Sequence, residues 1–270
     1  MNINLLGTVS VTINGNRHEI RANKVRAMLA TLAIEAGRAI SHRELADELW
    51  SGRSLGNPRN ALQAHATRLR RVLDRSASEP RRTSVLRAVR NGYLLDVPGE
   101  SVDGNRFLDL AARGSAALPD EPRKAAELLQ AGLRLWAGPA LLDACDGLRC
   151  RSAATLFEER RLTVWEDLID ARLIMGDERQ AIAELQPLVA KNPMRERFCE
   201  QLMLALYRSG RQGDALELFH WTRRRLDDEL GVQPGIPLRR RYTEILNQDP
   251  VLSSLSALRL DRGDLAITGG

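Results

Sequence analysis

Two related segments in the second half of the chain restrict its fold more than any other feature. Met175–Leu185 aligns with Ser209–Phe219, so that Gly176 lies over Gly210 at an offset of 34 residues. This is the period of tetratricopeptide repeats, in which each unit is a pair of helices. The alignment also places Ala181 over Ala215, and such small residues let paired helices approach closely. The spacing therefore predicts a helical repeat.

Helical patterns fill the whole region after Pro98 and Gly99. Apolar residues recur there with a helical period in seven segments, namely Phe107–Leu118, Arg123–Trp136, Ala153–Met175, Glu178–Ala190, Arg195–Tyr207, Gly213–Leu230 and Ile236–Leu246. A more divergent unit around Ala125–Leu135 would give the usual minimum of about three repeats. We assign residues 99–250 to an all-α, tetratricopeptide-like domain and residues 251–270, which lack a firm period, to a tail.

The first 98 residues have a different pattern, with strands first and helices afterwards. Residues 1–22 alternate as strands do, and Asn14-Gly15 suits a tight hairpin turn. A first helix is predicted from Lys24 to Ala36. Ser41 and Glu44 form a capping box that begins a second helix, and Asn57-Pro58 supplies a cap and a first-turn proline for a third, over about 57–74.

A predicted hairpin closes this domain. Its apolar residues are Val85, Val89, Tyr93, Leu95 and Val97, and its turn is Arg90-Asn91-Gly92. A helix-turn-helix followed by such a hairpin is a winged helix, in which the third helix enters the major groove of DNA. We therefore predict a mainly α protein, with a winged helix and small antiparallel sheets at residues 1–98 followed by the helical domain.

The third helix carries the candidate DNA-reading surface. Leu62, Ala66, Leu69 and Leu73 form one apolar stripe, and the opposite face has residue types that bond guanine or adenine edges. The predicted base-reading residues are Asn60, Gln63, Thr67, Arg68 and Arg71. Arg70 flanks this face and is predicted to reach a phosphate. On the hairpin the predicted DNA contacts are Arg87, Arg90 and Asn91. A solvated face in an arginine-rich protein is the alternative interpretation.

Charge distribution favours the DNA-binding interpretation. Residues 1–98 contain 16 basic and 8 acidic residues, a net charge of +8, whereas the remainder contains 24 and 27, a net charge of −3. A basic domain is typical of a nucleic-acid partner. The four histidines are scattered, the three cysteines form no CxxC pair, and no phosphate-binding loop or catalytic motif accompanies them. We predict no enzymatic activity, catalytic residue, metal or cofactor.

Two resemblances add to this interpretation. ALQAHATRLRRVL at 61–73 and RNGYLLDV at 90–97 resemble the OmpR-like winged helix found in the Streptomyces antibiotic regulatory protein (SARP) family. LWAGPALLD at 135–143 and the stretch 192–235 resemble the bacterial transcriptional activator domain that follows it, so that the likeness covers about 1–250. It implies that the helix at 57–74 reads promoter repeats. It also implies that Ser51–Pro58, with Arg53 and Leu55, contacts the RNA polymerase sigma factor.

The predicted function is that of a sequence-specific transcriptional activator. By the resemblance, it binds direct repeats beside the −35 element as a homodimer, recruits RNA polymerase holoenzyme and controls antibiotic or secondary-metabolite genes. No apolar run of about 18 residues and no signal peptide is found, so we expect a cytoplasmic protein without membrane contact. One alternative is a helical-repeat scaffold that binds a peptide or small ligand. Another is the N-terminal part of a larger signal-transducing regulator that continues past residue 270.

Overall fold

The computed structural model describes residues 1–50, 56–74 and 84–254. They form two compact units: Met1–Arg113 with Gln130–Thr163, and Gly114–Leu129 with the chain from Val164 onward. Each unit combines segments that are distant in the sequence, whereas the predicted domains, 1–98 and 99–250, are continuous ranges. The units therefore do not test the predicted domain boundary, which stays a prediction. Arg53 and Leu55, the predicted polymerase contacts, lie outside the described residues.

The first unit begins with a three-stranded antiparallel sheet of β1 (Asn2–Asn4), β2 (Ser10–Ile13) and β3 (Asn16–Glu19). Asn14 and Gly15 join β2 to β3 with φ values of 52° and 81°. Positive φ at both central residues is the geometry of the hairpin turn that the sequence predicts. The turn places Ile13 opposite Asn16 and directs the apolar side chains of β2 into the core.

Three helices follow: α1 (Asn23–Ile34), α2 (His42–Trp50) and α3 (Pro58–Leu73). The predicted capping box is confirmed, because the Ser41 N–H donates to the Glu44 carboxylate at 3.0 Å and the Glu44 N–H donates to the Ser41 hydroxyl at 3.2 Å. At the start of α3, the Asn60 N–H donates to the Asn57 side chain at 3.1 Å. Each local signal begins its helix where predicted.

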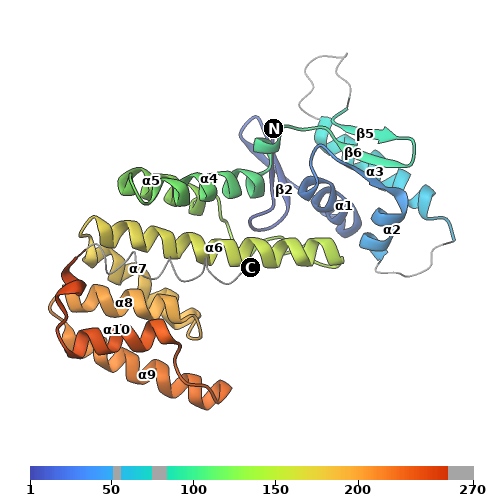
Figure 1. Cartoon of the computed structure of the whole chain (residues 1–270). Helices are drawn as coiled ribbons and strands as arrows, with labels where there is room; N and C mark the ends of the chain where they lie inside the picture. Colours follow the sequence, from blue (N-terminus) through green and yellow to red (C-terminus); the bar gives the residue numbers. More distant parts are fainter. Residues whose placement is uncertain (51–55, 75–83, 255–270) are drawn as a thin grey trace, which may run out of the picture. The chain divides into compact units, whose positions relative to one another are not determined.

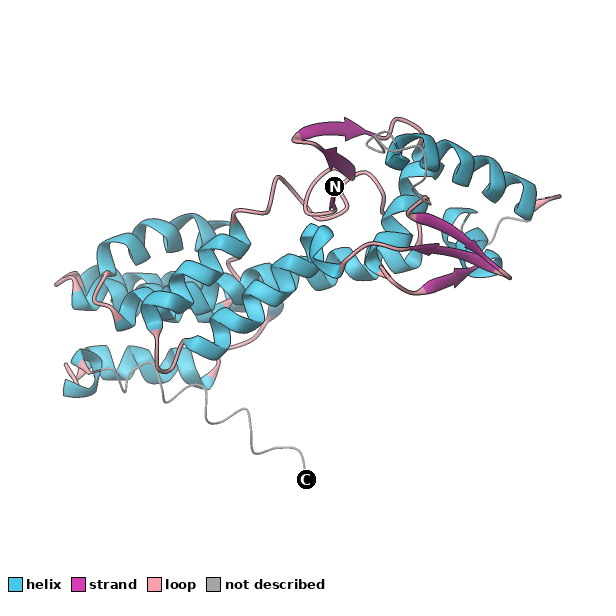
Figure 2. Cartoon of the chain, turned by 90° about the horizontal axis from the view of Figure 1, so that it is seen from above, coloured by secondary structure: helices cyan, strands magenta, loops and turns pink. Residues whose placement is uncertain are grey.

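The wing contains β5 (Leu86–Val89) and β6 (Gly92–Leu95), and it includes a strand that the sequence did not predict. The short β4 (Ala39–Ser41), between α1 and α2, pairs with β6 and gives the strand order β4-β6-β5. Strands are magenta in Figure 2. At Gly92 a Cβ would lie 1.9 Å from the carbonyl oxygen of Ile40. The glycine of the predicted turn is therefore required for close approach of β6 to β4.

Residues 99–113 and 130–163 contribute further to the first unit. The segment after Pro98 forms η2 (Gly99–Ser101) and α4 (Asp103–Ala117), and α5 (Pro122–Leu133) and α6 (Leu148–Ile174) follow. Backbone N–H groups of Ala137, Leu141 and Leu142 donate to the carbonyls of residues 6, 5 and 7 at 2.7–3.1 Å. The Asp143 carboxylate accepts from the Val9 N–H at 2.9 Å. The LWAGPALLD motif thus binds the segment between β1 and β2.

The second unit contains the predicted helical repeat. Its helices α7 (Glu178–Lys191), α8 (Glu196–Arg208), α9 (Gln212–Leu230) and α10 (Ile236–Leu246) lie against one another in Figure 1 and are followed by η3 (Pro250–Ser253). Gly176 and Gly210 have φ values of 75° and 76°, and Ala181 and Ala215 are fully buried. Equivalent positions of the 34-residue alignment therefore have equivalent structures, which confirms the repeat.

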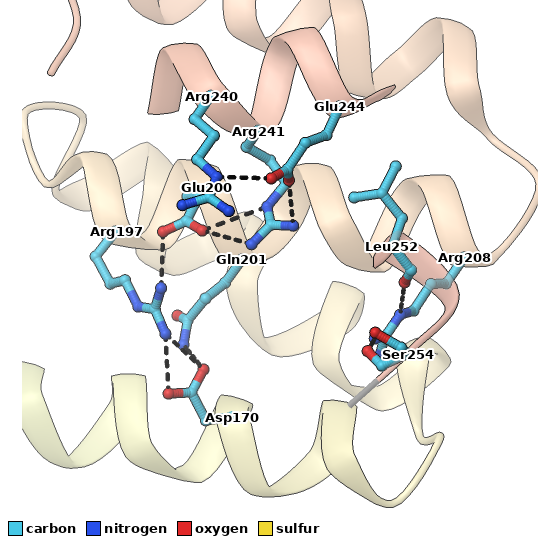
Figure 3. Close-up of polar contacts among 10 residues, drawn as sticks. All are labelled: Asp170, Arg197, Glu200, Gln201, Arg208, Arg240, Arg241, Glu244, Leu252 and Ser254. Carbon is cyan, nitrogen blue, oxygen red and sulfur yellow. Dashed lines mark hydrogen bonds and ion pairs between the residues drawn. The ribbon is translucent and has the colours of Figure 1, made fainter. Parts of the chain in front are cut away.

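A buried ionic network connects helices of this second unit (Figure 3). Arg197 donates to both carboxylate oxygens of Asp170 at 3.0 Å and to Glu200 at 2.7 Å. Arg241 donates to Glu200 at 3.0 Å and to Glu244 at 2.8 Å. Carboxylates and guanidinium groups alternate through the network, so that each charged group has a partner of opposite sign. Buried charges need such pairing. The network links α6, α8 and α10.

Candidate nucleic-acid interface

The two faces of α3 differ as the helical period predicts. Leu62, Ala66 and Leu69 are fully buried, and Leu73 is 2% exposed. The opposite face is exposed along its whole length and comprises Asn60, Gln63, Ala64, Thr67, Arg68 and Arg71. All five predicted base-reading residues are therefore accessible. Their contact with DNA stays a prediction.

The donor groups on this face are not all equally available. The Thr67 hydroxyl donates to the Gln63 carbonyl one turn earlier at 2.9 Å. Its hydrogen is thus used within the helix, whereas its methyl group and oxygen lone pairs remain for a ligand. Ala64 places a small apolar side chain in the same face. The amides and guanidinium groups of the other residues supply the donors that base-edge recognition requires.

Two further exposed arginines lie near helix starts and were not predicted from the sequence as DNA contacts. Arg59 lies in the first turn of α3, which contains no acidic residue, and Arg43 lies in the first turn of α2. A positive charge at a helix N-terminus opposes the helix dipole, so Arg59 does not favour helix formation. Its exposed guanidinium at this position suits an anion such as a phosphate. The sequence does contain a signal for Arg59, because its position directly after Asn57-Pro58 places it in the first turn of the predicted third helix.

The wing presents its predicted residues differently. Arg90 and Asn91 form the exposed turn between β5 and β6. Arg87, on β5, is also exposed, but its guanidinium pairs with the Asp96 carboxylate at 3.0 Å. The wing tip therefore offers the Arg90 charge to a ligand, whereas the charge of Arg87 is already balanced within the hairpin.

Arg70 has a different environment from the neighbouring Arg71. Its side chain is half-buried, and its Nε donates to the carbonyl of Leu86 at 3.0 Å. Its guanidinium carbon lies 6.0 Å from the centre of the Tyr93 ring. These contacts connect α3 to both strands of the wing hairpin. They favour a role inside the domain over the predicted phosphate contact.

His65 packs beside the exposed face of α3. Its ring centre lies 5.9 Å from that of Trp50 in α2, and its Nδ1 is buried without a partner among the described residues. Burial, followed by the nearby charges of Arg68 and Lys24, lowers the pKa of His65 below its ordinary value. The imidazole is therefore neutral at neutral pH and fits a packing role between α2 and α3.

The described residues offer little to a metal or a nucleophilic reaction. No group of three or more His, Cys, Asp or Glu side chains within the described ranges could hold a metal ion. Burial raises the pKa of the Cys150 thiol to about 12, so that this thiol is protonated at neutral pH.

Among the described residues, no helix combines the length and the apolar surface needed to span a bilayer.

Comparison with known proteins places these features in a family. Residues 16–95 match the family described as transcriptional regulatory protein, C terminal, and residues 102–246 match the bacterial transcriptional activator domain. The transcriptional regulator RedD of Streptomyces coelicolor is 60% identical over 256 residues, which cover 95% of this chain and 73% of RedD. The chain belongs to the SARP family of transcriptional regulators.

Other SARP relatives and a solved structure agree. The regulatory protein DnrI of Streptomyces peucetius is 36% identical over 93% of each chain. The regulatory protein AfsR of Streptomyces coelicolor is 37% identical, but this chain covers only 25% of AfsR. The structure of Mycobacterium tuberculosis EmbR in complex with a low-affinity phosphopeptide matches 98% of this SARP chain, and 70% of that chain, with a TM-score of 0.89 and 31% identity. The predicted fold class is thereby confirmed, and the SARP relatives are regulators of transcription, not enzymes.

Proposed function

We propose that this SARP-family regulator is a sequence-specific activator of antibiotic or secondary-metabolite genes. In this proposal α3 reads direct repeats beside the −35 element, and two copies bind side by side, one for each repeat. The observation that carries it is the exposed face of α3, where amide and guanidinium groups lie opposite a fully buried apolar stripe. These are the groups that distinguish base pairs in the major groove.

The wing supports the same proposal, because it offers charge to the DNA backbone. Arg90 is exposed at the tip of the hairpin and supplies positive charge for phosphates or for a narrow minor groove. Phosphate contacts fix the position of a protein on DNA, whereas base contacts give sequence preference. The winged helix therefore combines one surface for each purpose.

Recruitment of RNA polymerase completes the proposal. We assign it to Ser51–Pro58, the connection between α2 and α3, with the sigma factor of the holoenzyme as the partner. Its support is the family resemblance together with the order of the elements, because a segment directly before a recognition helix lies at the DNA surface. A neighbouring polymerase subunit at the −35 element can reach such a segment. This function places the protein in the cytoplasm.

Footprinting of the full chain on a library of genomic promoter fragments tests the proposal. The expected result is protection of direct repeats adjoining a −35 element, with fragments that carry them bound at least tenfold more tightly than random DNA at the same salt concentration. Equal affinity for all fragments would reject sequence-specific binding. That result would instead support the helical-repeat scaffold, in which the basic domain only localises the protein.

A further inference from the structure

We infer that Arg70 is a positioning residue that fixes the wing hairpin relative to the recognition helix α3. The inference rests on the proposed DNA-binding function and adds to it the group that sets the distance between its two DNA-binding surfaces. Arg70 is on α3, in the turn that faces the wing, and its side chain is half-buried. It contacts both strands of the hairpin.

The first contact is to β5. The Arg70 Nε donates to the carbonyl of Leu86 at 3.0 Å, and Leu86 is 1% exposed. A carbonyl at such a buried position needs a donor, and a guanidinium gives a stronger hydrogen bond than a neutral group does. Leu86 also pairs with Leu95 of β6. Arg70 therefore holds the end of the hairpin that is farthest from the tip.

The second contact is to β6. The Arg70 guanidinium carbon lies 6.0 Å from the centre of the Tyr93 ring, at the outer range of a cation–π contact. Tyr93 is 5% exposed and also contacts His42, the first residue of α2, with ring centres 5.4 Å apart and edge to face. The backbone N–H of His42 donates to the Asn91 carbonyl at 2.9 Å. Tyr93 is thus held by side chains from α2 and α3.

A smaller contact acts beside Arg70 at the end of α3. The Ser84 hydroxyl donates to the Asp74 carboxylate at 3.0 Å, and the Leu86 N–H donates to the Ser84 hydroxyl at 3.3 Å. The polar groups at the last turns of α3 therefore converge on Leu86. By contrast, the adjacent Arg71 is exposed on the face that the proposal assigns to DNA.

These contacts have a consequence for DNA binding. Arg90 and Asn91 are at the tip of the hairpin, between the ends of β5 and β6. If the base of the hairpin loses its hydrogen bond to α3, the tip keeps the pairing of β6 with β4 and the bond from His42 to Asn91, but β5 loses its contact with α3. The Arg90 side of the tip then gains freedom to move, and binding must order it. The loss of affinity on removal of Arg70 should therefore act through the wing tip, while base preference, which depends on the exposed face of α3, stays the same.

A double-mutant cycle on the full chain tests this inference. Affinity for a footprinted promoter fragment would be measured at several KCl concentrations for the wild type, Arg70→Ala, Arg90→Ala and the double variant. We expect Arg70→Ala to weaken binding about fivefold or more in the wild-type background. In the Arg90→Ala background, the change in log affinity caused by Arg70→Ala should be less than half as large. Arg71→Ala is the matched control, whose effect should add to that of Arg90→Ala.

Arg70→Lys separates positioning from direct contact with phosphate. Lysine keeps the charge but lacks the planar fork that bonds Leu86 and lies near Tyr93, so the positioning role predicts that Arg70→Lys behaves like Arg70→Ala. The inference would be overturned if the effects of Arg70→Ala and Arg90→Ala were additive, and if Arg70→Ala lowered the slope of log affinity against log salt by about one while Arg70→Lys restored it. Arg70 would then be a phosphate contact.

Two further measurements keep the result interpretable. If Arg70→Ala lowers the thermal midpoint so far that the winged helix unfolds, Arg70→Gln replaces it in the cycle, and the same non-additivity is expected. Hydrogen exchange of the backbone amides in Gly92–Leu95 should be faster in either variant, and exchange as slow as in the wild type would contradict the inference. Failure of the proposed function itself has a different signature, because the wild type would then bind promoter and random DNA equally.

Discussion

The carboxylate of Glu48 accepts a hydrogen bond from the backbone N–H of Cys150 at 2.9 Å, although 102 positions separate the two residues. Its second oxygen accepts from the Arg149 N–H at 3.0 Å, and both donors belong to the first turn of α6. A negative charge at this position complements the helix dipole and satisfies two N–H groups. Gly147 is required beside it, because a Cβ there would lie 2.1 Å from the carboxylate. Glu48 thus connects α2 to α6.

Substitution of Glu48 should destabilise the first unit. Glu48→Ala leaves the buried N–H of Cys150 and the half-buried N–H of Arg149 without an acceptor, so we expect the free energy of unfolding to fall by about 2–4 kcal/mol. Glu48→Gln retains one acceptor and should have a smaller effect. Urea unfolding followed by circular dichroism measures both. Asp47→Ala, at an exposed neighbouring position, is the control and should stay within about 0.5 kcal/mol of the wild type. An equal effect of the two alanine variants would contradict the capping role.

Variants of the α3 face should alter base preference. Arg68→Ala and Gln63→Ala each remove an exposed side chain, and each should relax discrimination at one or two operator positions by about 1–3 kcal/mol. Binding to a set of single-base operator variants measures this effect. Arg123→Ala, at an exposed position in the second unit, should change neither affinity nor preference. Equal loss of affinity on operator and random DNA would reject base readout by these residues.

The wing tip should contribute charge without sequence preference. Arg90→Ala is expected to weaken binding to every sequence by a similar factor and to lower the slope of log affinity against log salt by about one, because one phosphate contact is lost. Titrations at four KCl concentrations on operator and random DNA provide the measurement. If the slope is the same as in the wild type, Arg90 does not neutralise a phosphate.

Activation and DNA binding should separate at the connection between α2 and α3. With Arg53 and Leu55 both replaced by alanine, operator affinity should stay within a few tenths of a kcal/mol, as for most surface substitutions. Transcription by purified RNA polymerase holoenzyme should fall. Parallel loss of operator binding would make the segment a DNA contact or a structural support. Unchanged transcription would move the polymerase contact to another surface.

Asp103 predicts a pH dependence of stability. Its carboxylate accepts from the N–H groups of Leu5 and Leu6, but burial outweighs these hydrogen bonds and raises its pKa from 3.8 to about 6. The folded protein therefore binds more protons than the unfolded chain between about pH 4 and 6, so this residue makes the free energy of unfolding fall as pH rises through that window. Above the window its contribution is constant.

Comparison with Asp103→Asn isolates this contribution. The free energy of unfolding of the wild type minus that of the variant should decrease between pH 4.5 and 7, by at most about 3 kcal/mol. Urea titrations at closely spaced pH values measure the difference, which removes the effect of all other titrating groups that the two proteins share. Parallel stability curves would show that the pKa of Asp103 does not differ between the folded and unfolded states.

Local signals explain what the sequence predicted well. The bounds of α7, α8, α9 and α10 differ from the predicted ones by a single residue at most. Glycines with positive φ mark several of these bounds, since Gly176 lies just before α7, Gly210 follows α8 and Gly231 ends α9. The exposed face of α3 follows from its apolar stripe alone. In these cases the residues that decide the structure are neighbours in the chain.

Contacts between distant segments explain what the sequence did not predict. Strand β4 has three residues, too few to show alternation, and it exists because Ile40 pairs with Tyr93. Glu48 looks like an ordinary polar residue of α2, and its burial depends on residues about 100 positions later. Arg70 lies at the border between the two faces of α3, where helical periodicity does not decide whether a side chain points to DNA or to the wing. Its direction comes from Leu86 and Tyr93.

The binding of residues 5–9 by residues 137–143 also bears on how the protein is made. A ribosome adds about 5–20 residues per second, so the segment that donates to the carbonyls of Leu5, Leu6 and Gly7 is synthesised about 7–27 s after them. During that time α3 is already synthesised, whereas the segment between β1 and β2 still lacks its partners at residues 137–143. The first unit can therefore complete its core only after residues 137–143 have been synthesised.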